Sequence, residues 1–277
     1  MIVLIAIPVI IDVIKDINEN QFINPLRQIL DKNGIMNSSA TLLGIKVSLS
    51  VVCLGLLFSP VLDKRESAYK YVFILFSLLA LMCVIHLINR TGIILAFISF
   101  FCILLFNAKR IPILSMLCSA MLLITVFVFL QSTIDFGDKV EQSYENRDEG
   151  ESSVSSAGGR TWRWKKGIED LYLYPLGYSN NGTRTTYAHN YWLDTSATAG
   201  VFPFVFLIIL TILYLKRNYF LIVQMKQGLL RSLIIVCNIG FFLTCFVEPV
   251  MEGFMLYVFL FFFFIGITSQ MYLGNKY

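Results

Sequence analysis

The sequence has little charge for its length. Only 14% of its 277 residues are charged and 57% are hydrophobic, whereas soluble domains have about 25% charged and about 45–50% apolar residues. Apolar runs this long would have no side to turn toward water, which argues against soluble Rossmann folds, barrels and sandwiches. No basic stripe interleaved with aromatic residues is present, so nucleic acid is not expected as a partner. The composition indicates a membrane protein.

Histidine is scarce, and the cysteines lie far apart. The chain has two histidines, His86 and His189, and six cysteines, none of which forms a CxxC pair. A zinc site built from Cys and His therefore lacks ligands at usable spacing. All six cysteines fall within apolar runs, so no disulfide framework is expected. We predict neither a metal nor another cofactor.

Long apolar runs are abundant. A helix needs about 20 apolar residues to cross a hydrocarbon core of about 30 Å, and the fold class predicted is an all-α polytopic transmembrane helix bundle. The opening run 1–14 is too short for a comfortable span and lacks signal-peptide features, so it is interpreted as the remainder of a helix whose beginning is missing. The other spans are predicted near residues 41–61, 70–88, 92–106, 111–131, 196–215, 232–248 and 253–272.

Basic residues occupy alternate loops, and the positive-inside rule places those loops in the cytoplasm. The remaining connections, among them the turn at Arg90 and the long stretch 132–195, then face outward. The predicted domains are therefore N-terminal membrane helices (1–131), an extracytoplasmic loop (132–195) and C-terminal membrane helices (196–277). The loop bases used for this assignment are Lys64, Arg65, Lys70, Lys109, Arg110, Lys216, Arg217, Lys226 and Arg231.

The outer loop changes character along its length. Residues 135–151 carry seven acids against two bases, a composition typical of flexible chain. From Arg160 onward bases predominate, with aromatic residues among them, and such a segment at a membrane face suits an anionic ligand. These bases are Arg160, Arg163, Lys165, Lys166 and Arg184.

A short amphipathic helix is predicted near the start of this basic part. Trp164, Ile168 and Leu171 lie at i, i+4 and i+7, which places them on one helical face. We expect this helix to lie on the bilayer surface, with Trp162 and Trp164 near the headgroups and Arg160 and Arg163 turned toward a cleft. The alternative is that these residues are ordinary interfacial anchors and snorkelling bases.

A second polar cluster precedes the next apolar run. Gly177 and Gly182 mark turns, and Asn190 is placed to cap a helix that carries His189 at its mouth. Such a helix N-terminus offers N–H groups and a positive end to a phosphate. The alternative for His189 is a polar side chain satisfied at the entrance of a span.

Arg90 lies between two predicted spans, and His86 lies four residues before it, which would put both on one helical face. An ionisable pair at membrane depth indicates a functional site, although a lone arginine snorkelling to the interface is an alternative. Glu248 and Glu252, also outward, either orient the arginines or are plain loop charges, and the second explanation is favoured from the sequence.

Taken in order, these segments resemble the pattern of the O-antigen ligase/polymerase family. The family pattern reads roughly Gly-Arg, Trp, Pro-x-Gly, His-Asn and then a Gly before an apolar span, with an upstream Ser-Arg-x-Gly segment in which this chain has Asn for Ser. The resemblance covers about residues 85–215. Its elements here are Asn89-Arg90-Thr91-Gly92, Gly159-Arg160, Trp164, Pro175-Leu176-Gly177, His189-Asn190 and Ala199-Gly200.

The resemblance implies a GT-C-like bundle that transfers a glycan from a polyprenyl diphosphate carrier at the outer face of the bacterial inner membrane, without metal or nucleotide sugar. Its partners would be the lipid-linked glycan donor, a glycan or lipid acceptor, the bilayer and other polysaccharide-assembly proteins. By that analogy Arg90 and Arg160 contact the diphosphate, and His189 assists the acceptor hydroxyl or the leaving group. The further substrate-binding residues expected are Arg163, Trp164, Arg184 and Asn190.

Several functions remain open from the residues alone. A polymerase would extend a growing chain and a ligase would move the finished glycan to its acceptor, and we lean slightly to the polymerase. An exporter of lipid or polysaccharide should show charged residues at mid-span, and almost none is found. In a non-catalytic component of a glycan-assembly complex, Arg160 and His189 would be dispensable.

Overall fold

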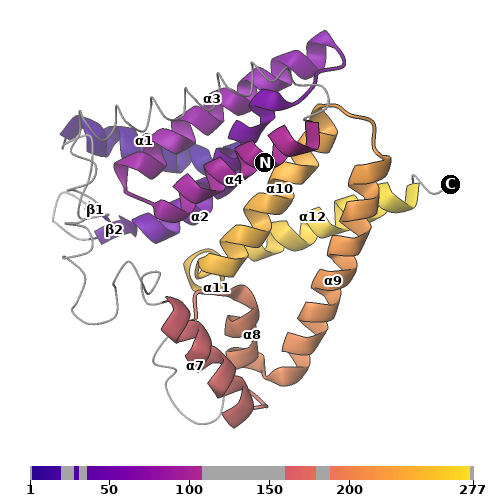
Figure 1. The fold of residues 1–277 in the computed structure, drawn as a ribbon. Helices are drawn as coiled ribbons and strands as arrows, with labels where there is room; N and C mark the ends of the chain where they lie inside the picture. The colour runs from indigo at the N-terminus through magenta and orange to yellow at the C-terminus, as the bar shows by residue number, and fades with distance from the viewer. Residues whose placement is uncertain (1, 20–27, 31–35, 108–159, 179–187, 275–277) are drawn as a thin grey trace. The chain divides into compact units, whose positions relative to one another are not determined.

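The structure is a computed structural model that describes residues 2–19, 28–30, 36–107, 160–178 and 188–274. Almost every described segment is helical (Figure 1), which confirms the all-α prediction. The predicted span 111–131 lies outside the described residues, and the other predicted spans correspond to helices. Six described segments are long and apolar enough to cross a membrane: Ala40–Phe58, Lys64–His86, Arg90–Asn107, Val201–Gln224, Leu229–Val247 and Met255–Gly274.

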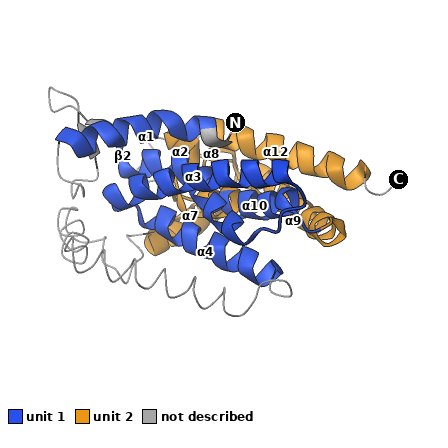
Figure 2. Cartoon of the chain, turned by 90° about the horizontal axis from the view of Figure 1, so that it is seen from above, with its two compact units in different colours: residues 1–149, 227–240 blue, residues 150–226, 241–277 orange. Residues whose placement is uncertain are grey.

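The chain forms two compact units (Figure 2). Unit 1 comprises residues 1–149 and 227–240, and unit 2 comprises residues 150–226 and 241–277. Helix α10 (Leu229–Val247) supplies residues to both units. The predicted division at residues 131 and 195 concerns topology across a membrane and stays a prediction.

Unit 1 is a helix bundle with small aliphatic residues at its centre. Helix α1 (Ile2–Glu19) packs against α2 (Ala40–Val51) and α3 (Lys64–His86), while α4 (Arg90–Asn107) packs against α2 and the 3-10 helix η1 (Val52–Phe58). Small side chains let helices approach closely, which drives association in a membrane where the hydrophobic effect is weak. The core includes Ala6, Val9, Val13, Leu43, Val47, Ala80 and Val84.

A short antiparallel pair of strands, β1 (Gln28–Leu30) and β2 (Met36–Ser39), precedes α2 and was not predicted. Side-chain caps then set the helix starts of this unit. The Ser39 hydroxyl accepts from the N–H of Leu42, and the Asp63 carboxylate accepts from the N–H of Glu66 at 2.7 Å. The Glu66 carboxylate reaches back to the N–H of Leu62, an arrangement close to a capping box.

The turn between α3 and α4 corrects one expectation. Helix α3 ends at His86 and α4 begins at Arg90, so these two residues do not share one helical face. The N–H groups of Ile88 and Asn89 return to the carbonyls of Ile85 and Val84, which is the Schellman ending of a helix. Ile88 takes the left-handed position (φ 48°) that glycine usually occupies there. Because no glycine marks this ending, it could not be predicted from the residues at the turn.

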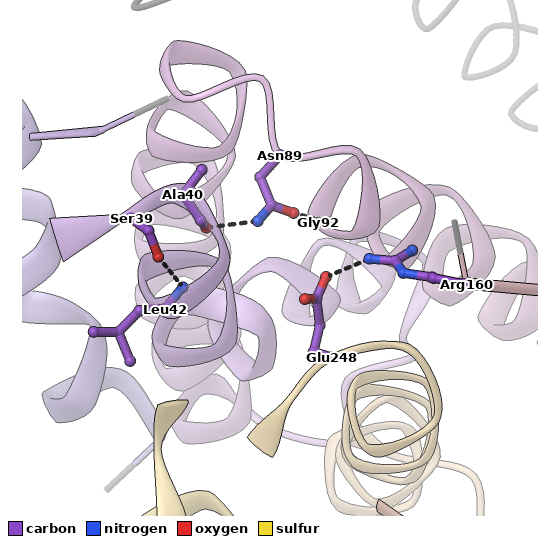
Figure 3. A network of polar contacts seen from close by, with 7 residues as sticks. All are labelled: Ser39, Ala40, Leu42, Asn89, Gly92, Arg160 and Glu248. Atoms are coloured by element: carbon purple, nitrogen blue, oxygen red, sulfur yellow. Dashed lines mark hydrogen bonds and ion pairs between the residues drawn. The ribbon is translucent and has the colours of Figure 1, made fainter. Parts of the chain in front are cut away.

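Asn89 holds this turn in place (Figure 3). Its amide group donates to the carbonyl of Ala40 at 2.8 Å, and its side-chain oxygen accepts from the N–H of Gly92 at 2.8 Å. The side chain is buried, so both bonds are shielded from water. Arg90, the first residue of α4, therefore directly follows a residue that is hydrogen-bonded to the start of α2.

Asn89→Ala is expected to lower the stability of the full chain by about 2–3 kcal/mol, because it removes a helix cap and leaves the buried Ala40 carbonyl without this donor. Asn89→Ser is the matched variant, since serine also caps helices but is too short to reach Ala40. The thermal midpoint of the purified chain in detergent should fall most for alanine and by an intermediate amount for serine. Equal loss in both variants would contradict the capping role.

Unit 2 contains α7 (Arg160–Leu173), α8 (Tyr191–Ala199), α9 (Val201–Gln224), α11 (Val250–Gly253) and α12 (Met255–Gly274), together with the end of α10. Helix α8 packs against α7, α9 and α11, and α9 packs against α12. Aromatic rings fill the space between the spanning helices of this unit, with centroids 5.2 to 5.9 Å apart for the pairs that join Tyr214, Phe241, Phe242, Tyr257 and Phe261.

The span expected at 196–215 is in fact two helices. Helix α8 ends at Ala199 and α9 begins at Val201, because Gly200 between them has a φ of 89° that breaks the helical path. The predicted turn at Gly177 is confirmed by its φ of 86°. The N–H of Val201 donates to the carbonyl of Pro175 at 2.8 Å, so the two glycine turns lie against each other.

Candidate functional site

Helix α7 packs closely onto α8 through a glycine. A methyl group on Gly167 would lie 3.5 Å from Leu193 and 3.6 Å from Ala188, which is ordinary van der Waals contact. Trp164, one turn earlier, contacts the ring of Phe246 edge to face at 4.9 Å. Its indole N–H is buried and has no acceptor within the described part of the chain. The helix therefore contacts its neighbours through Trp164 and Gly167.

Of the predicted apolar stripe of α7, Trp164 and Leu171 are half-buried and Ile168 is 61% exposed. The stripe was expected to lie on the bilayer surface, and that placement stays a prediction. Trp162 is exposed and has the ammonium of Lys166 at 5.6 Å from its ring centroid. The helix ends at Leu173, just before Tyr174 and Pro175.

Arg160, the first residue of α7, forms an ion pair with Glu248 (Figure 3). The Arg160 Nη2 atom lies 3.3 Å from Oε1 of Glu248. The Glu248 side chain is only 5% exposed, whereas that of Arg160 is 29% exposed. A carboxylate at this depth requires a partner. The structure thus supports the alternative that Glu248 orients an arginine, over the plain loop charge that the sequence favoured.

Asn190 caps α8 as predicted. Its side-chain oxygen accepts from the N–H groups of Trp192 at 3.1 Å and Leu193 at 3.2 Å. Its amide group donates to the backbone carbonyl of Phe246 at 3.2 Å. One side chain therefore satisfies donors at the start of α8 and an acceptor at the end of α10.

Asp194 is a site residue that the sequence reasoning missed. Its two carboxylate oxygens accept from the N–H groups of Ala188 at 2.9 Å and Asn190 at 3.0 Å, and the residue is 1% exposed. His189 lies between these two amides with a φ of 52°. The sequence feature that could have identified Asp194 is an acid in the first turn of a helix that Asn190 caps. Asp194 lies one position later than the acid of a capping box.

Tyr191 begins α8 and is also buried. Burial raises the pKa of Tyr191 to about 12, with the neighbouring Cys245 adding to the shift. Its phenol therefore stays protonated near neutral pH and is unsuited to act as a base. No group of three or more His, Cys, Asp or Glu residues is placed to hold a metal ion in the part of the chain that the structure describes.

Residues 246–248, which we call the α10 exit segment, bring the unit 2 candidates together. Phe246 contacts Trp164 and accepts from Asn190, and Glu248 pairs with Arg160. Arg163, on the same helix as Arg160, is half-buried.

The remaining candidates stand apart from this cluster. Arg184 lies outside the described residues. Arg90 is half-buried at the start of α4 and belongs to unit 1. A shared site for Arg90 and the unit 2 residues stays a prediction.

A family model described as O-Antigen ligase matches residues 74–208. This range includes Arg90, Arg160, His189 and Asn190, and it ends before Glu248. No curated protein and no solved structure matches the chain.

Proposed function

The chain belongs to the O-antigen ligase/polymerase family through residues 74–208, and from this premise we propose that it transfers glycan from a polyprenyl diphosphate carrier to a glycan or lipid acceptor. Its family and the six long apolar helices among the described residues make it a multi-pass membrane protein of surface-polysaccharide assembly. The proposed location is the bacterial inner membrane, with the site facing the periplasm or exterior. Other assembly proteins are proposed as partners, and no metal is assigned a role.

The observation that carries the proposal is that Arg160 and Asn190, the residue directly after His189, both bond to the α10 exit segment. When the bond between the anomeric carbon and the diphosphate breaks, negative charge builds on the departing oxygen. A guanidinium held in advance stabilises that charge without having to reorganise. The ion pair with buried Glu248 holds Arg160 in this way.

His189 is proposed as the general base. The imidazole accepts the proton of the acceptor hydroxyl while that oxygen attacks the anomeric carbon, and the diphosphate leaves with the bonding electron pair. Histidine suits this step because its usual pKa lies near neutral pH. Assistance to the leaving group by His189 is the alternative role.

The other candidates are proposed to bind the donor. Arg90 is proposed to contact the diphosphate, and Arg163 and Arg184 to add positive charge near it. Trp164 offers a buried indole N–H and an aromatic surface. Between the two activities of the family we lean to the polymerase, in which the acceptor is itself a lipid-linked glycan.

His189→Ala and Arg160→Ala are expected to abolish glycan transfer, because each removes a group assigned to the reacting atoms. His189→Ala should reach the membrane at the normal level, whereas Arg160→Ala also removes a partner of buried Glu248, so its membrane level is measured beside its activity. Lys165→Ala is the control, since this base is exposed on the same helix as Arg160 and has no assigned role. The measurement is a gel of surface glycan from a deletion strain of the host, complemented with each variant. Full activity of both alanine variants would overturn the site assignment.

The same gel separates the two activities. Surface glycan shortened to one repeat on its acceptor in the deletion strain indicates a polymerase. Full-length glycan stranded on the lipid carrier indicates a ligase. Glycan unchanged by the deletion contradicts the proposed transferase function and reopens the exporter and the non-catalytic component.

A further inference from the structure

We propose that Asp194 is a positioning residue whose carboxylate clamps the backbone on both sides of His189 and fixes where the imidazole lies. The inference rests on the proposed function, since it takes His189 as the base. It adds a residue to which no role in the reaction has been assigned, and it explains why a buried acid stands in the first turn of α8.

The clamp consists of two hydrogen bonds that backbone N–H groups on either side of His189 donate to one carboxylate. Oδ1 of Asp194 accepts from the N–H of Ala188 at 2.9 Å, and Oδ2 accepts from the N–H of Asn190 at 3.0 Å. Hydrogen bonds to an ionised acceptor are roughly twice as strong as neutral ones. The residue is 1% exposed, so water does not compete for its oxygens.

The residue inside the clamp has an unusual backbone. His189 has a φ of 52°, in the left-handed region that only a few per cent of residues other than glycine adopt, although histidine is found there more often than most. Such a conformation persists only when the surrounding structure over-determines it, and it is typical of functional sites. The two bonds to Asp194 supply that constraint directly, since they hold the residues before and after His189.

A second tether connects the clamp to the other proposed catalytic group. Asn190, one of the two clamped residues, donates to the carbonyl of Phe246, and Glu248 two residues later pairs with Arg160. The clamp thus sets His189 relative to the same segment that orients Arg160. Both oxygens of Asp194 accept backbone N–H groups, so we infer that it acts through the placement of His189 rather than on the substrate.

The variant Asp194→Asn tests the positioning role with little change in the shape of the side chain. The amide keeps one acceptor oxygen but points an NH2 group at one of the two backbone N–H groups. A displacement of about 1 Å at a catalytic group costs about 100-fold in rate, so kcat should fall by about that factor while KM for the donor changes little. Asp194→Glu keeps two acceptor oxygens and should recover part of the rate. Glu169→Gln, which removes an exposed acid from α7, should leave the rate unchanged.

The assay uses the full chain purified in detergent and the lipid-linked repeat unit extracted from the deletion strain of the host. Hydrogen exchange of the segment 188–193 in the same preparations provides a readout that does not depend on activity. Exchange at this segment should rise in Asp194→Asn, partly recover in Asp194→Glu and stay unchanged in Glu169→Gln. Higher exchange together with a lower kcat and an unchanged KM supports the proposal.

The outcomes separate a failure of the clamp from a failure of the proposed function. Unchanged exchange in Asp194→Asn overturns the clamp, whatever the activity. Higher exchange with an unchanged kcat, while His189→Ala is inactive, overturns the positioning role and leaves the proposed function standing. Full activity of His189→Ala overturns the proposed site and with it the role, and the exchange pattern still decides whether the clamp exists.

Discussion

Gly200→Ala is expected to keep the chain from accumulating in its folded form. Gly200 joins α8 to α9 with φ 89° and ψ −173°, a backbone region that is essentially open to glycine alone. A methyl group at this position would lie 2.5 Å from the carbonyl oxygen of Pro175 and 2.8 Å from the carbonyl carbon of Leu176. Both are backbone atoms, so no side chain can rotate away to make room.

Backbone strain and the clash together should cost at least about 3 kcal/mol. Movement of Pro175 would also break its hydrogen bond from Val201, and α8 would lose its alignment with α9. The measurements are the membrane level and the thermal midpoint of the solubilised chain. Gly266→Ala is the control, because nothing lies within 4 Å of a methyl group there and alanine favours a helix. A normal midpoint for Gly200→Ala would contradict this geometry.

Loss of either partner in the Asp16–His86 pair should also destabilise the chain strongly. The Nε2 atom of His86 lies 2.7 Å from Oδ2 of Asp16, and the two side chains are 0% and 6% exposed. This pair joins α1 to the end of α3, four positions before Arg90 in the sequence. Breaking a buried pair by removing one member typically costs about 3–5 kcal/mol, since the other polar group stays buried.

Asp16→Leu and His86→Leu should therefore each lower the thermal midpoint, and the double variant should lose less than the sum of the two. Replacing both members of a buried pair with apolar side chains is often close to neutral. Glu19→Gln on the same helix is the control, because Glu19 is exposed. Additive losses in the double variant would show that the two side chains do not act as a pair.

The parts of the fold that the sequence predicts are those set by neighbouring residues. The end of α7 at Leu173 and the cap of α8 at Asn190 follow from the chemistry of nearby residues. The membrane spans follow from the length of the apolar runs. The left-handed turn at Gly177 follows from the freedom of glycine, whereas the similar turn at Ile88 lacks that mark. The helix break at Gly200 was missed because the expected span was extended back through the small residues 196–199.

Ion pairs between distant residues were beyond such reasoning. Glu248 and Arg160 are 88 positions apart, and Asp16 and His86 are 70 apart. Periodicity assigns a residue to a face but does not say which distant element packs on that face.

The α10 exit segment has a mechanical consequence for an enzyme that works at a bilayer. Spanning helices tilt when the thickness of the surrounding lipid changes. The tethers of Arg160 and Asn190 end within residues 246–248, at the point where α10 ends. When this helix tilts, the residues that bond Arg160 and Asn190 therefore move together. The distance between Arg160 and Asn190 then changes little with the lipid composition of the bilayer.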